Sequence, residues 1–134
     1  MKIYVFDASA VFVFLQKEPG AHKINELLKD AVRGQAEIIM SAVNHGEVYG
    51  GLLREHGPER ARATMSAVHP LPIRIEDATP QRAFQAAEVK EKYKLYYVDS
   101  FAAALAIESR GTLVTSDSDF RRLGQNFPTV WLKA

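Results

Sequence analysis

The chain has 134 residues, a length typical of one globular domain, so residues 1–134 are expected to form a single unit. Hydrophobic residues make up 47% and charged residues 25%, and no apolar run approaches the roughly 18 residues that a membrane-spanning helix needs. Asp7 interrupts the first apolar run before it can serve as a secretory signal, which favours a cytoplasmic location. With no cysteine, disulfides and thiolate chemistry are excluded, and a net charge of +1 neither favours nor excludes a nucleic-acid partner.

The first half of the chain alternates between strand and helix signals. Residues 3–6 are continuously apolar, which predicts a central strand buried on both faces. Asp7 and Ser9 can cap the short helix that follows, and the Pro19-Gly20 pair stops it. The next predicted elements are a helix over about 21–33, a strand at 38–40, a helix from Ser41, and a second helix antiparallel to it after the Gly57-Pro58 break.

The second half continues the alternation. Residues 71–75 alternate in polarity and predict a short strand, which Pro72 places at an edge of the sheet. The remaining predicted elements are a helix from Thr79-Pro80 to near Lys94, a helix capped by Asp99 and ended by Gly111, a strand at 112–115, a turn into a short helical segment at 117–120, and a strand at 129–132. This order implies an α/β sandwich with a mainly parallel sheet of four to five short strands.

Four acids stand where the chain passes from one element to the next. Asp7 and Asp117 follow predicted strands, whereas Glu47 and Asp99 lie early in predicted helices. Each acid alone can be a helix cap, a turn residue or a solvated helix residue. Because ligands of parallel sheets bind beyond the carboxyl ends of the strands, we expect the four carboxylates to meet at one edge. Their mutual repulsion would then favour a bound divalent cation.

The predicted site has only oxygen ligands, which suits Mg²⁺ or Mn²⁺ better than zinc. Such ions activate water and stabilise the charge that develops on a phosphate. The acids therefore predict phosphodiester hydrolysis without a serine, cysteine or histidine nucleophile.

The chain resembles the PIN domain family, and within it the VapC-type ribonuclease toxins of toxin–antitoxin pairs. The resemblance covers nearly the whole length and rests on four segments: VFDASA at 5–10, NHGE at 44–47, YVDSFAAA at 97–104 and LVTSDSDF at 113–120. Many relatives have Thr at the position of Ser9 and Asn at that of Ser116, and both replacements are conservative. The resemblance implies a three-layer α/β/α sandwich.

The resemblance also implies which residues form the site. Four acids would be catalytic and would bind Mg²⁺ or Mn²⁺, namely Asp7, Glu47, Asp99 and Asp117. Asp7 and Asp99 would lie most directly on the ion. Three further residues would support the pocket, namely Ser9, Thr115 and Asp119.

The implied function is that of an endoribonuclease, the toxin of a type II toxin–antitoxin system, which forms a homodimer and is silenced by a cognate antitoxin. Arg121 and Arg122 follow the last acidic segment and are candidate contacts to RNA phosphates, although a solvated helix surface explains them as well. Two alternatives stay open: a non-catalytic PIN-like scaffold that binds proteins, and a DNA-directed nuclease.

Overall fold

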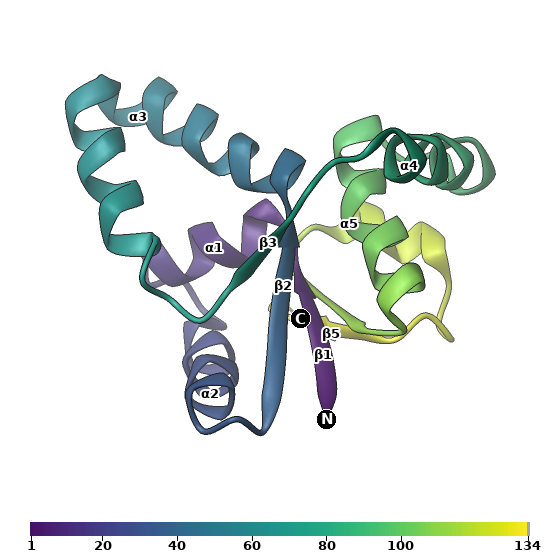
Figure 1. Cartoon of the computed structure of the whole chain (residues 1–134), viewed down its shortest axis with the longest axis horizontal. Helices are drawn as coiled ribbons and strands as arrows, with labels where there is room; N and C mark the ends of the chain where they lie inside the picture. Colours follow the sequence, from purple (N-terminus) through teal and green to yellow (C-terminus); the bar gives the residue numbers. More distant parts are fainter. Residues whose placement is uncertain (134) are drawn as a thin grey trace.

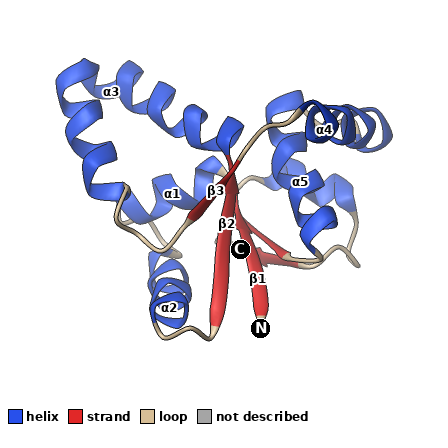
Figure 2. Ribbon diagram, viewed as in Figure 1, coloured by secondary structure: helices blue, strands red, loops and turns tan. Residues whose placement is uncertain are grey.

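The structure, a computed structural model, describes residues 1–133 and consists of one sheet with helices on both faces (Figures 1 and 2). The strands are β1 (Lys2–Phe6), β2 (Ala36–Ser41), β3 (Arg74–Glu76), β4 (Thr112–Thr115) and β5 (Thr129–Trp131). The helices are α1 (Ala8–Leu15), α2 (Ala21–Val32), α3 (Ala42–Val68), α4 (Pro80–Tyr93), α5 (Tyr97–Ser109) and the 3₁₀-helix η1 (Ser118–Leu123). Within this part of the chain, no helix has the length and apolar character needed to cross a bilayer.

The sheet has the strand order β3-β2-β1-β4-β5, and every pair is parallel. The predicted parallel α/β sheet is thereby confirmed, with β1 at its centre and β3 at an edge. Phe6 at the end of β1 pairs with Val114, one residue before the end of β4. The residues that follow these two strands therefore emerge side by side at the carboxyl edge of the sheet.

Alternation along each strand divides the core into two layers. Phe6 and Val114 pack with α1, α2 and α3, whereas their neighbours Val5 and Leu113 pack with α4, α5 and η1. Figure 1 shows the same division, with α1, α2 and α3 on one side of the sheet and α4 and α5 on the other. Because both faces are covered, the strands are apolar on both sides, which is the reason for the continuous apolar run at the start of the sequence.

One local prediction is confirmed and another is wrong. The helix break expected at Gly57-Pro58 is present, because Gly57 has a non-helical φ of 79° and ψ of 171° and divides α3 into two helical segments that meet at a kink. Asp99 does not cap α5, because the helix begins earlier and Tyr96 is its N-cap residue, without a side-chain cap. Asp99 lies in the first turn of the helix, where a carboxylate interacts favourably with the helix dipole.

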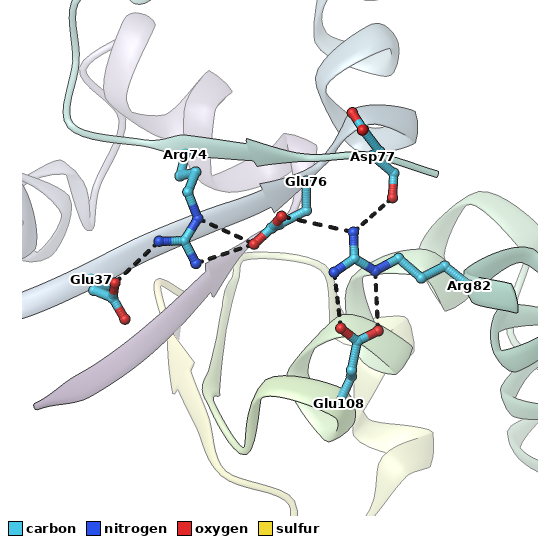
Figure 3. A network of polar contacts seen from close by, with 6 residues as sticks. All are labelled: Glu37, Arg74, Glu76, Asp77, Arg82 and Glu108. Atoms are coloured by element: carbon cyan, nitrogen blue, oxygen red, sulfur yellow. Dashed lines mark hydrogen bonds and ion pairs between the residues drawn. The ribbon is translucent and has the colours of Figure 1, made fainter. Parts of the chain in front are cut away.

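A network of charged residues ties the edge strand to the helices behind it (Figure 3). Arg74 of β3 lies 3.1 Å from both Glu37 and Glu76, and Arg82 of α4 binds both carboxylate oxygens of Glu108 at 2.9 and 3.1 Å. Arg82 also approaches Glu76 at 3.7 Å. Separate surface ion pairs contribute little, but a connected network with a bidentate arginine helps to hold β3 against α4 and α5.

Candidate metal centre

Asp7 is the N-cap residue of α1 and is 95% buried, since only 5% of its surface is exposed. Its Oδ1 accepts hydrogen bonds from the Ser9 hydroxyl at 2.7 Å and from the Ala10 N–H at 3.0 Å. Its Oδ2 accepts one from the fully buried Thr115 hydroxyl at 2.6 Å. The carboxylate is thus held from both its own helix and the neighbouring strand.

The same two hydroxyls fix the loop after β4. The Ser116 N–H donates to the Ser9 Oγ at 2.9 Å, and the Asp117 N–H donates to the Thr115 Oγ1 at 3.0 Å. The two hydroxyl oxygens lie 3.2 Å apart. Ser9 and Thr115 therefore couple the position of Asp7 to that of the loop that carries Asp117.

Three half-buried acids form the tightest group of the site. One carboxylate oxygen from each of Asp99, Asp117 and Asp119 lies within 4.8 Å of the others. Asp117 caps η1 by accepting the Asp119 N–H at 2.9 Å, which turns both side chains toward the start of α5. The sequence predicts Asp119 as a supporting residue, but the structure places its carboxylate in the same group as those of Asp99 and Asp117.

Glu47 approaches this group from α3 and is exposed to solvent. The Asn44 side-chain amide, one helical turn earlier, lies 3.5 Å from the Glu47 carboxylate and 3.1 Å from the Val98 carbonyl. Asn44 belongs to the NHGE segment, but no role for its side chain is predicted from the sequence. The available signal is its spacing of three residues from Glu47, which places both side chains on one face of a helix.

The pKa values of three acids are raised, first by burial and then by repulsion between the acids. Burial raises the pKa of Asp7 to about 6, against the lowering effect of the hydrogen bonds from Ser9, Thr115 and Ala10. Burial, followed by repulsion from Asp117 and the other acids, raises the pKa of Asp99 to about 7. Although Glu47 is exposed as a residue, its carboxylate is partly desolvated, and its pKa is raised first by this desolvation and then by the charge of Asp117. The site therefore carries more negative charge than the chain itself compensates.

The donor set fits a hard divalent cation. All candidate ligands are carboxylate oxygens, and three of them converge closely enough to share one ion. A cation at this point would relieve the repulsion that raises the pKa of Asp99. Asp99, Asp117 and Asp119 would contact the ion first, and Asp7 and Glu47 lie close enough to add to the field around it.

The two arginines predicted to contact RNA lie in η1, beside this group, and each already has a partner. The Arg121 guanidinium lies 4.1 Å from the centre of the Trp131 ring, a cation–π contact. Arg122 donates to the Lys94 carbonyl at 3.0 Å, at the end of α4. Both residues are exposed, so these contacts leave part of each surface open.

Solved structures of similar fold include chains from toxin–antitoxin complexes and a toxin described by itself. VapBC2 from Rickettsia felis, bound to a DNA fragment from its promoter, has a chain 20% identical, with a TM-score of 0.75 over 96% of this chain and 97% of that chain. DNA-bound VapBC from Salmonella typhimurium has a chain 18% identical, with a TM-score of 0.70 over 98% of this chain and 99% of that chain. VapC20 from Mycobacterium tuberculosis is described as a toxin that cleaves the sarcin–ricin loop. It is 18% identical, with a TM-score of 0.65 over 94% of this chain and 96% of that chain.

These identities establish a shared fold. Among curated proteins, none matches significantly. Residues 4–126 match the family model described as the PIN domain, and this match includes all of the acids described above. The chain therefore belongs to the PIN domain family.

Proposed function

We propose that this protein is a Mg²⁺- or Mn²⁺-dependent endoribonuclease that hydrolyses phosphodiester bonds in RNA, and that it acts as the toxin of a type II toxin–antitoxin pair. The observation that carries the proposal is the convergence of Asp99, Asp117 and Asp119 within 4.8 Å, next to the buried Asp7, in a PIN domain. Its fold is shared by a chain of a VapBC complex and by VapC20, which is described as a toxin that cleaves the sarcin–ricin loop.

In the proposed mechanism, Asp7, Glu47, Asp99 and Asp117 are the catalytic acids and hold the ion together with Asp119. When bound, the metal would supply an activated water and would offset charge on the phosphate. Asp7 cannot turn away from the site, because Ser9 and Thr115 hold both of its oxygens.

RNA is the proposed substrate because the site suits a phosphodiester and because of the RNA-cleaving neighbour of similar fold. Arg121 and Arg122 extend the site on the side of η1, and their exposed surfaces are available to RNA phosphates. Arg121 is already oriented by Trp131, which reduces the entropy lost when it binds a phosphate.

The proposal includes a cognate antitoxin and a homodimer, as the VapBC complexes of similar fold suggest. An inserted Arg or Lys of the antitoxin would interact with the same acids that hold the ion, and would therefore compete with it. The toxin, once free of the antitoxin, would act on RNA in the cytoplasm. Size-exclusion chromatography with light scattering tests the dimer directly.

The first experiment is cleavage of a mixed RNA pool and of matched DNA by the purified, antitoxin-free protein, with Mg²⁺ or Mn²⁺ and with EDTA. We expect RNA cleavage that requires the metal and is lost in both Asp7→Asn and Asp99→Asn. Glu55→Gln, which alters an exposed acid of α3 away from the sheet edge, is the control and should cleave as wild type does. Cleavage of DNA alone would favour the DNA-directed nuclease, and a folded protein that cleaves neither would favour the protein-binding scaffold.

A further inference from the structure

Asn44 connects the two helices that bring Glu47 and Asp99 to the site. Its side chain is fully buried between α3 and the first turn of α5. The Nδ2 group donates to the Val98 carbonyl at 3.1 Å, and at 3.5 Å it makes a longer contact with the Glu47 Oε1. Val98 immediately precedes Asp99. One amide group thus contacts the backbone beside one acid and the carboxylate of another.

The contacts determine the orientation of this amide. Both partners of Nδ2 are acceptors, so the reversed amide would place its oxygen against a carbonyl and a carboxylate. In the observed orientation the Oδ1 is buried, and no group within residues 1–133 donates to it. The chain therefore satisfies only the donor half of this amide.

Stability does not explain an amide at this position. A buried carbonyl oxygen for which the protein provides no donor costs about 1–3 kcal/mol, and an apolar side chain of similar volume avoids that cost. The Val98 carbonyl lies in the first turn of α5, so it also has the helix itself as a source of a hydrogen bond. An apolar residue, however, could not donate the hydrogen bond that joins α3 to the Val98 carbonyl at the beginning of α5.

The beginning of α5 requires such support. Its N-cap residue, Tyr96, provides no side-chain cap. Among the described residues, 1–133, the donors to the Tyr96 carbonyl are the Ser100 N–H and hydroxyl, which belong to the same helix. Asp99 and Glu47 repel each other across the gap between α5 and α3. A bond from Asn44 to the Val98 carbonyl opposes the separation that this repulsion favours.

We propose that Asn44 is a positioning residue of the metal centre, which fixes the first turn of α5 relative to α3 and so holds Asp99 and Glu47 at the spacing that binds the ion. The inference rests on the proposed function only for its metal centre. It does not depend on RNA as the substrate. Residues that orient metal ligands in this way typically change metal affinity about 10–100-fold when they are replaced.

The test separates metal affinity from stability with two complementary variants. Asn44→Leu keeps the approximate volume and removes the amide, whereas Val48→Ala opens a cavity in the same helix at another fully buried residue. Mn²⁺ affinity is measured by isothermal titration calorimetry without RNA, and stability by urea unfolding in EDTA. We expect Asn44→Leu to bind Mn²⁺ at least about 10-fold more weakly without a large loss of stability. Val48→Ala should lose stability and keep the wild-type affinity.

Wild-type Mn²⁺ affinity in Asn44→Leu would overturn the inference, as would an equal loss of affinity in Val48→Ala or a wild-type protein that binds no Mn²⁺. If Asn44→Leu fails to fold, Asn44→Ala gives the same comparison far below its unfolding temperature. A wild-type protein that binds Mn²⁺ but cleaves no RNA would refute the proposed function and leave this inference to be decided by the Asn44 variants alone.

Discussion

The burial of Asp7 predicts that the metal-free protein loses stability as the pH rises. In the unfolded chain an aspartate titrates near its ordinary pKa of 3.8, whereas in the folded protein burial raises the pKa of Asp7 to about 6. The folded state therefore binds the proton more tightly than the unfolded state does. Protonated Asp7 does not reduce the free energy of unfolding, so Asp7 causes no loss of stability below about pH 4. Ionisation of Asp7 in the fold is unfavourable, so stability is lost as the pH rises through about 6.

The magnitude follows from the same pKa values. A pKa difference of one corresponds to 1.36 kcal/mol, so the change from 3.8 to about 6 corresponds to about 3 kcal/mol. Asp7→Asn removes the charge and keeps the shape. Its amide can accept from Ser9 and donate to Thr115, and the Thr115 hydroxyl can turn toward the Ser9 oxygen 3.2 Å away. We therefore expect the variant to be more stable than wild type at pH 7.5, by at most about 3 kcal/mol.

The assay is urea unfolding of both proteins in EDTA at pH 4.5, 6 and 7.5. The difference in free energy of unfolding should be at most about 1 kcal/mol at pH 4.5, where Asp7 is ionised in the unfolded chain but still protonated in the folded protein, and should grow to at most about 3 kcal/mol at pH 7.5. Glu55→Gln, a change at an exposed acid, should stay within about 0.5 kcal/mol of wild type. An Asp7→Asn variant that is less stable than wild type at pH 7.5, or a difference that does not change with pH, would refute the reasoning.

Three further predictions concern the same region and the end of the sheet. Mn²⁺ at about 100 times its Kd should raise the unfolding free energy at pH 7.5 by about 2.7 kcal/mol in thermal melts, and the absence of any shift would contradict a metal centre. Ser9→Ala should destabilise the protein by about 1–3 kcal/mol in urea, because Asp7 loses a donor and the Ser116 N–H loses its acceptor. Gly20→Ala should lower the free energy of unfolding by more than about 1 kcal/mol, because Gly20 has a φ of 101° and a Cβ there would overlap the Leu132 carbonyl oxygen. A melting temperature equal to that of wild type would disprove this prediction.

Local sequence signals predict most of the elements because local forces decide them. The continuous apolar run of β1 correctly predicts a central strand, because a strand with both faces covered needs apolar side chains on both sides. Thr79 caps α4 as predicted, because a cap depends only on residues adjacent in the chain. The break at Gly57-Pro58 is predicted for the same reason, because glycine and proline act on the adjacent backbone. The early start of α5 is less predictable, since packing between elements determines where a helix without a side-chain cap begins.

The sequence by itself determines that acids follow β1 and β4 and lie early in α3 and α5, because these positions depend on chain order and on the parallel sheet. Only the tertiary structure decides which acids lie closest together and what holds them. Asp119 joins Asp99 and Asp117 because η1 turns there, and Asn44 reaches the Val98 carbonyl from 54 positions earlier in the chain. Contacts between residues so far apart in sequence depend on how the helices pack on the sheet, and no local pattern encodes that packing.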